Sequence, residues 1–238
     1  MKLKIVILSV IFLCTICIKS FPQQNERIKA SYMLAFGRNP YPSELNYWLG
    51  RGNLSIEQLI LLHRQGFIEI PSLHSETIIN SYIDALGRKP SEDEIKYWMN
   101  GDFIYIELLN DHMKLLQLNN WENERVIKLS YEKVFDRVPG NAEMNLWKKK
   151  GATAFFLLAG YLEYSKRTVN NEAGNIGAAD VRNFLSVSTI SLSPPIASEA
   201  LKFINKSVTK SVAGIITRNG GNIITSGKHN IFPGENLN

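Results

Sequence analysis

Cysteine is nearly absent from this chain. Both cysteines, Cys14 and Cys17, lie within the first 20 of 238 residues. We expect those residues to be removed, and the remaining chain then has no disulfide, no thiol nucleophile and no thiolate metal site. A secreted chain without disulfides is typical of bacterial periplasmic or surface proteins. The sequons at Asn53 and Asn205 leave secretion from a eukaryotic cell as an alternative.

An excess of positive charge is also lacking once the N-terminal residues are set aside. The formal net charge is +5, but residues 1–20 contain three lysines and no acidic residue, so their removal leaves +2. A net charge this small gives no support to nucleic-acid binding.

Apolar runs long enough to cross a membrane are lacking as well. The apolar stretch over residues 5–18 is short for a membrane-spanning helix. Two lysines precede it, and Lys19 and Ser20 follow it. This order predicts a signal peptide over residues 1–20 and a secreted, periplasmic or cell-surface protein. Lipidation at Cys17 and an uncleaved anchor are the alternatives to cleavage.

Catalytic motifs are the last absence. The histidines form no His-x3-His or His-Glu-x2-His pattern, and the glycine motifs of hydrolases and nucleotide-binding proteins do not occur. His63 and His112 differ in their position relative to the repeat described next, so we expect no repeated histidine site. His74 is expected in a linker. We predict a protein that is not an enzyme and has no catalytic residues, metal or cofactor.

One pattern, Tyr-x5-Arg-x-Pro-x3-Glu-x3-Trp, occurs three times at offsets of 50 and 49 residues. We interpret it as three tandem repeats of one helical unit of about 50 residues, over residues 25–66, 75–118 and 123–165. We predict structural roles for the residues that define the repeat. These residues are Tyr32, Arg38, Pro40, Glu44, Trp48, Tyr82, Arg88, Pro90, Glu94, Trp98, Tyr131, Arg137, Pro139, Glu143 and Trp147.

Each copy predicts three helices. An amphipathic stretch precedes the arginine, and Gly37, Gly87 and Asp136 then stand where a left-handed helix C-cap is expected. A short helix follows the proline, and a third helix follows a polar turn. We therefore predict an all-α fold with no strand before residue 165.

Two capping boxes are predicted at helix starts. Ser91 with Glu94 begins a second helix, and Ser55 with Gln58 begins a third helix. In each box, we expect the serine side chain to accept from the backbone N–H three residues later. The Glu or Gln side chain at that later position should accept from the backbone N–H of the serine.

The recurring residues have functional readings that compete with the structural ones. The tyrosines and tryptophans, if exposed, would form a carbohydrate-binding module, but their apolar helical spacing favours a core. Each arginine and glutamate, six residues apart, could be an acid/base pair, but we favour a clasp between two helices. The carboxylates of residues 92–94 are typical of a solvated helix N-terminus rather than a glycosidase pair, so a secreted hydrolase is the weaker alternative.

Residues 34–40 with 44–48, and 85–90 with 94–98, resemble a bacterial domain-of-unknown-function family built on Leu-Gly-Arg-x-Pro followed by Tyr-Trp. That family occurs in secreted and surface-layer-associated proteins and is distantly similar to phycobilisome linkers. The resemblance covers about residues 25–165 and weakens in the third copy. It implies an exported helical scaffold or protein-interaction module without established activity. The calcium-binding glycine repeats often found beside that family are absent, so a calcium role does not carry over.

The polar tail, residues 166–238, predicts two elements. An amphipathic helix over 196–212, after a stop at Pro194 and Pro195, could lie on an anionic membrane or dock on the repeats, and we expect docking. Two similar apolar segments around a glycine pair indicate a β-hairpin over 212–226. The expected partner is another protein or a cell-envelope component, with no nucleic acid.

Overall fold

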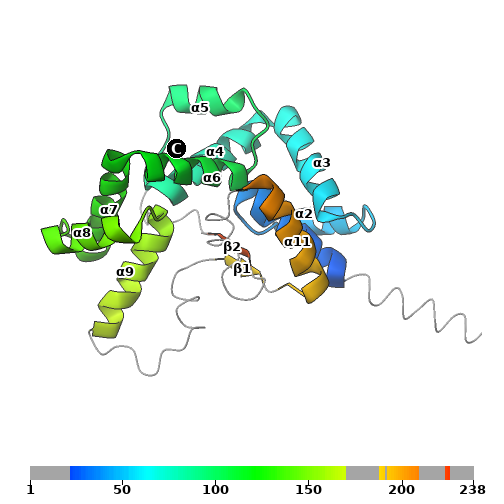
Figure 1. Cartoon of the computed structure of the whole chain (residues 1–238). Coiled ribbons are helices and arrows are strands. Elements are labelled where there is room, and N and C mark those ends of the chain that lie inside the picture. The colour runs from blue at the N-terminus through cyan, green and yellow to red at the C-terminus, as the bar shows by residue number, and fades with distance from the viewer. Residues whose placement is uncertain (1–21, 170–187, 191, 209–222, 226–238) are drawn as a thin grey trace, which may run out of the picture.

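The computed structural model describes residues 22–169, 188–190, 192–208 and 223–225. The predicted signal peptide therefore lies outside the described residues. Apart from one pair of three-residue strands, the described structure is all-helical, as predicted (Figure 1).

Nine helices occupy residues 22–169, and a short helix lies between two longer ones three times in succession. They are the helix over residues 22–36, α2 (Pro42–Leu49), α3 (Ile56–Glu69), α4 (Pro71–Leu86), α5 (Glu92–Met99), α6 (Tyr105–Leu118), α7 (Asn120–Phe135), α8 (Asn141–Lys150) and α9 (Phe155–Val169). This part of the chain contains no strand, which confirms the prediction for the residues before 165.

The local signals at helix ends act as predicted. The side chain of Ser91 accepts from the Glu94 N–H, and Ser55 does the same for the Gln58 N–H, each at 3.2 Å. Both capping boxes are confirmed. They satisfy backbone donors that a helix start leaves without an intrahelical partner.

The glycines that end the first long helices serve two purposes. Gly37 and Gly87 have φ of 71° and 67°, a conformation that L side chains rarely adopt. A Cβ at Gly37 would lie 2.6 Å from the ring of Tyr105, and one at Gly87 would lie 2.7 Å from the ring of Phe155. Each ring belongs to a helix about 70 residues later in the chain, so each glycine also permits close packing. Asp136 adopts the same conformation, with φ of 55°, after α7.

The successive groups of helices are joined without linkers. A single residue, Ile70, separates α3 from α4, and Asn119 alone separates α6 from α7. The prediction that His74 lies in a linker is wrong, because α4 begins at Pro71 and includes it. Proline is well tolerated in the first turn of a helix, so Pro71 starts α4 instead of ending a helix.

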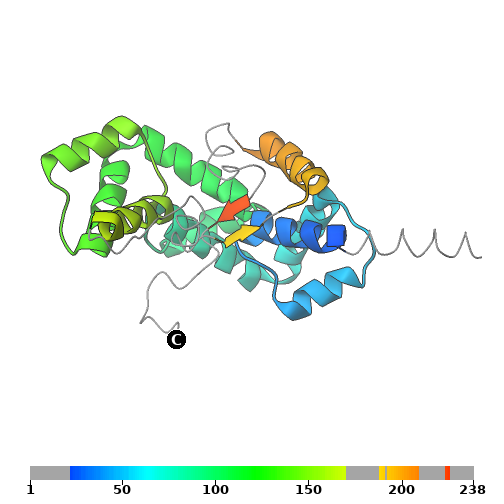
Figure 2. The same cartoon turned by 90° about the horizontal axis from the view of Figure 1, so that it is seen from below.

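One main core runs through most of the molecule. It combines fully buried side chains from the helix over 22–36 and from α3, α4, α6 and α9, for example Leu34, Leu59, Leu86 and Leu108. A second, smaller cluster lies within α7, α8 and α9. α8 lies at one end of the molecule, whereas α11 (Pro194–Ser207) lies in the other half, alongside α3 (Figures 1 and 2).

The tail differs from its prediction in two respects. α11 begins at Pro194, with Ser193 as N-cap, so reading the proline pair as a stop was wrong. Prolines are favoured at the first helical positions because their missing N–H has no partner there. The helix also ends at Ser207, with Val208 in extended conformation, short of the predicted residue 212.

The predicted hairpin is described only in its last residues. There β2 (Ile223–Thr225) pairs antiparallel with β1 (Ser188–Ile190), with Thr189 opposite Ile224. The other half of the predicted hairpin lies outside the described residues. The contact that the structure does show joins segments more than 30 residues apart.

α11 docks on the helices before residue 170, as we expected. Ile196, Ala200 and Ile204 are buried in the main core, and the helix contacts α3 and α6. The apolar face of α11 is therefore covered by its own chain.

Candidate functional site

The arginine and glutamate of the repeated pattern form a bidentate ion pair in every copy. The two guanidinium-to-carboxylate hydrogen bonds measure 2.8 and 2.9 Å for Arg38 with Glu44, and 2.8 and 2.7 Å for Arg88 with Glu94. Arg137 with Glu143 repeats the geometry at 2.8 and 2.7 Å. These are the clasps predicted from the sequence, each joining the end of one helix to the start of the next.

Each clasp glutamate also caps its own short helix. Its carboxylate accepts from the backbone N–H three residues earlier, at 2.7 to 2.8 Å, in the pairs Tyr41–Glu44, Ser91–Glu94 and Gly140–Glu143. Hydrogen bonds from the arginines hold the pKa of Glu94 and of Glu143 at about 2. Carboxylates that remain ionised to such low pH are poorly suited to be general acids near neutrality.

The tyrosine and tryptophan of the pattern are hydrogen-bonded to each other. The indole Nε1 donates to the phenol oxygen in Trp48–Tyr32, Trp98–Tyr82 and Trp147–Tyr131, at 3.0, 2.9 and 3.1 Å. All three tyrosines are buried. Burial raises the pKa of Tyr32 to about 12, so the phenol stays neutral.

The tryptophans are less available than a sugar platform requires. Trp48 and Trp147 are only 8% and 7% exposed, whereas Trp98 is half-buried. The guanidinium of Arg51 lies 5.7 Å from the ring of Trp48, and the ammonium of Lys150 lies 4.5 Å from that of Trp147. The core interpretation is confirmed for the tyrosines and for these two tryptophans.

The histidines hold a repeated site that our sequence reasoning missed. His63 and His112 are each the eighth residue of their helix, α3 and α6. The Nε2 of His63 lies 3.0 Å from the Ser31 hydroxyl, and that of His112 lies 3.1 Å from the Ser81 hydroxyl. The expectation of no repeated histidine site is therefore wrong.

A one-residue difference in loop length hid the equivalence. Residues 50–55 join α2 to α3, whereas the shorter segment 100–104 joins α5 to α6. Counting from the helix start instead of from the tryptophan would have aligned the two histidines. The eighth residue of α9 is Leu162, which is buried beside Tyr131 and Trp147.

The two histidines are buried and neutral. Each serine hydroxyl donates to a backbone carbonyl of its own helix, Ser31 to Ile28 and Ser81 to Ile78, both at 2.8 Å. Since a hydroxyl has one proton, Nε2 is the donor in each histidine–serine contact. Burial lowers the pKa of His63 to about 3 and that of His112 to about 4.

His74 has a different setting in the first turn of α4. Its ring is buried and stacks on Phe67 at 4.5 Å between centroids, with the planes 17° apart. Burial lowers its pKa as well. The side chains of His63, His74 and His112 are therefore all buried.

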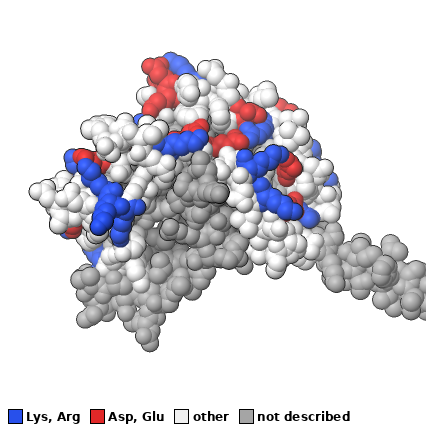
Figure 3. Space-filling model, viewed as in Figure 1, with Lys and Arg blue, Asp and Glu red and all other residues white. Residues whose placement is uncertain are grey.

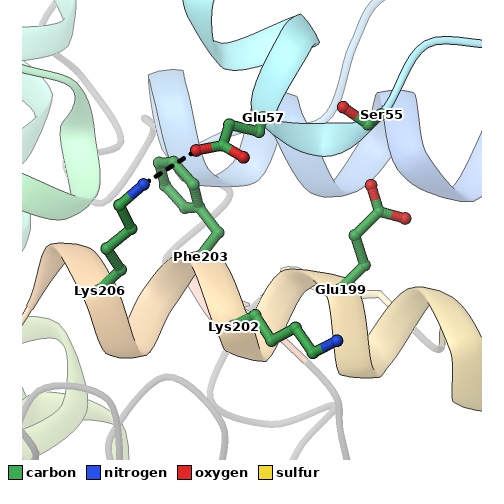
Figure 4. A pocket seen from close by; sticks show the side chains of 6 residues that line it. All are labelled: Ser55, Glu57, Glu199, Lys202, Phe203 and Lys206. Atoms are coloured by element: carbon green, nitrogen blue, oxygen red, sulfur yellow. Dashed lines mark hydrogen bonds and ion pairs between the residues drawn. The ribbon is translucent and has the colours of Figure 1, made fainter.

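A pocket of about 270 Å³ lies between the start of α3 and α11. Figure 4 shows its side chains, with Glu57 and Lys206 paired across the two helices at 3.1 Å. The residues that line it are Ser55, Glu57, Glu199, Lys202, Phe203 and Lys206.

Glu199 explains why the pocket is a docking contact within the chain. One carboxylate oxygen accepts from the backbone N–H of Ile56 at 2.7 Å, at the start of α3. The other accepts from Nε of Arg27 at 2.9 Å. At the start of α11, the N–H and the hydroxyl of the N-cap residue Ser193 donate to Glu26. Glu199 and the Glu57–Lys206 pair thus hold α11 against the helix over 22–36 and α3.

Two other kinds of site are absent from the described ranges. In those residues, no group of three or more His, Cys, Asp or Glu side chains could hold a metal ion. No helix in the described part of the chain has the length and apolar character needed to span a bilayer.

No protein-family model, curated protein or solved structure matches the chain. The resemblance to the Leu-Gly-Arg-x-Pro family stays a prediction.

Proposed function

We propose that this chain is an exported, non-enzymatic scaffold or protein-interaction module at the cell surface or in the periplasm. The proposal combines the signal peptide predicted over residues 1–20 with the threefold sequence pattern and its helices. In these copies the clasp, the Trp–Tyr hydrogen bond and the long–short–long helix order recur together. Repeated units of this kind stack to form extended surfaces that bind other macromolecules.

The observation that carries the proposal is how the recurring polar groups are used. Every guanidinium, carboxylate, indole N–H and phenol of the pattern bonds to another group of its own unit. These residues build the unit, and the short helices expose other side chains at the surface. There Tyr47, Tyr97 and Leu146 occupy the same position, before the tryptophan, and are 53%, 68% and 50% exposed.

Exposed tyrosines beside arginines are typical of binding surfaces for macromolecules. Tyr47 lies under the guanidinium of Arg51 at 4.5 Å, and Tyr41 lies under that of Arg38 at the same distance. The first unit therefore presents two aromatic side chains, each held by a cation.

A carbohydrate-binding module remains the second candidate, supported by the exposure of Tyr97 and the half-buried Trp98. The rings of Tyr97 and Trp98 meet edge to face, with 5.1 Å between their centroids. Titration with cell-wall glycans would then quench the fluorescence of Trp98, and a Trp98→Phe variant would lose that response. The buried Trp48 and Trp147 would contribute little to it.

The scaffold proposal is tested by co-sedimentation of the purified chain with the isolated envelope of the producing cell. We expect the chain to pellet with the envelope, and Tyr47→Ala with Tyr97→Ala to pellet about tenfold less, because exposed aromatic anchors dominate such contacts. Leu61→Ala, at an exposed site on α3, is the matched control. A chain that stays in the supernatant, or a double variant that pellets like the wild type, would contradict the proposal.

A further inference from the structure

The second and third units carry opposite charge. Residues 71–119 contain four Lys or Arg against eight Asp or Glu, whereas residues 120–169 contain nine against six. Figure 3 shows acidic side chains over α5 and basic side chains over the end formed by α7, α8 and α9. The second unit is therefore acidic and the third unit is basic.

The contrast is sharpest on two equivalent short helices. α5 contains three acidic residues in its first turn and Lys96 in its last, a net charge of −2 on the helix itself; Glu94 is held by Arg88 in the clasp, and Lys96 lies 3.5 Å from Asp93. α8 contains Glu143 in its first turn and three lysines in its last, a net charge of +2. Both helices lie on the outside of the molecule, and α5 has no buried residue at all.

Each of these helices has an exposed apolar side chain on its charged face. Asp93 and Tyr97 are four residues apart on α5, and Leu146 and Lys149 are three residues apart on α8, so each pair shares a helix face. If the two helices lie antiparallel, the acidic start of one meets the basic end of the other. The same register places Tyr97 beside Leu146, because both helices rise about 1.5 Å per residue.

We propose that the α5 face of one copy of this chain binds the α8 face of a second copy. The contact joins different surfaces, so each copy keeps one free α5 face and one free α8 face. Association then continues from copy to copy into a chain or a closed ring. This inference rests on the proposed scaffold function and names the partner of that scaffold as the protein itself.

Sedimentation velocity of the purified chain over a concentration series tests the proposal. We expect oligomers at low salt that dissociate at high salt, because about 1 M salt screens charges beyond about 3 Å. Two charge-reversal variants break one face each, Glu92→Lys/Asp93→Lys on α5 and Lys149→Glu/Lys150→Glu on α8. Each should associate about tenfold or more weakly than the wild type, since like charges then face each other.

Mixing the two variants distinguishes this interface from any other. Each variant keeps one intact face of the original charge, but the broken faces also complement each other in sign. A mixture of the α5 variant and the α8 variant should therefore associate through the intact α8 face of the first and the intact α5 face of the second, and the two charge-reversed faces can extend this association beyond the mixed dimer. Variants that stay monomeric when mixed, while the wild type associates, would overturn the proposal.

The matched control reverses two lysines outside both faces, Lys29→Glu/Lys202→Glu, and so has the same net charge as the α8 variant. It should associate like the wild type. A control that also becomes monomeric would show that net charge and not the α8 face governs association, and would overturn the proposal. A wild type that is monomeric at all salt concentrations would overturn it too.

Folding of each variant is checked by far-UV circular dichroism and thermal melting. A single substitution per face, Asp93→Asn or Lys149→Gln, serves where a double reversal fails to fold, and should weaken association in the same direction. Failure of the scaffold function would instead be read from the envelope experiment, which does not depend on self-association.

Discussion

Acid should destabilise this protein before its carboxylates titrate, because His63 and His112 are buried in neutral form. In the unfolded chain each histidine has its ordinary pKa of about 6.5. In the folded chain the pKa values are about 3 and about 4. Below pH 6.5 the unfolded state therefore binds protons that the folded state does not, so the free energy of unfolding falls as the pH falls.

The size of the effect follows from this proton uptake. Between pH 7 and pH 5 the unfolded chain gains about three quarters of a proton at each site, which lowers the free energy of unfolding by about 2 kcal/mol per histidine. The two sites together give about 4 kcal/mol, a large part of the stability of a typical domain. His74, whose pKa is also lowered by burial, adds in the same direction.

The third unit supplies the matched variant. Leu162 occupies the eighth position of α9, where the first two units have histidine. Replacement of either histidine by leucine, His63→Leu or His112→Leu, therefore follows an arrangement that the protein already uses. Each serine keeps its hydrogen bond to a backbone carbonyl.

The assay is chemical denaturation at pH 7 and at pH 5, followed by far-UV circular dichroism. The difference in the free energy of unfolding between pH 7 and pH 5 should be about 2 kcal/mol smaller in each leucine variant than in the wild type. A wild type equally stable at both pH values, or leucine variants with an unchanged difference, would refute the reasoning. The low-pKa glutamates do not confuse the result, because Glu94 and Glu143 lose their stabilising effect only below their unfolded pKa of about 4.5.

Two further predictions concern packing and docking. Gly87→Ala should destabilise the fold by about 2 to 4 kcal/mol, since the new Cβ meets the ring of Phe155 in a left-handed backbone; Gly66→Ala, in open space within α3, should be neutral or stabilising by up to about 1 kcal/mol. Thermal melts of the two variants check this, and equal losses would count against it. Glu199→Ala should destabilise by about 1 to 2 kcal/mol and increase amide exchange in α11, since it removes the cap on α3. Lys202→Ala, exposed on the same helix, should leave both unchanged, and identical behaviour of the two would contradict the docking role of Glu199.

Local features of the fold could be predicted from the sequence because their signals lie within one helix or one turn. The clasp of Arg38 with Glu44 spans six residues, and the capping box at Ser91 spans three. The left-handed conformation at Gly87 required only a glycine followed by a proline. In each case the residues that determine the geometry are close in the chain.

Features that depend on distant residues could not be predicted. The sequence indicates that Gly87 ends a helix, but not that the ring of Phe155 packs against it. Nothing near Glu199 indicates that its carboxylate caps α3, whose Ile56 N–H lies 143 residues earlier in the chain. Such contacts depend on the arrangement of complete helices in space.

The prediction that His63 and His112 form no repeated site was wrong for a more specific reason. Distances counted from Trp48 and Trp98 include the loops that follow these residues, and the second loop is one residue shorter. Loops tolerate such length changes, whereas the register within a helix is fixed by its hydrogen bonds. Repeats are therefore better compared helix by helix than by a constant offset.

Export is the claim on which the proposed function depends most directly. Fractionation of the producing cell, with intact-mass analysis of the chain in each fraction, tests it in one measurement. We expect the chain outside the cytoplasm, with a mass that corresponds to a start near residue 21. A full-length chain confined to the cytosol would contradict the account.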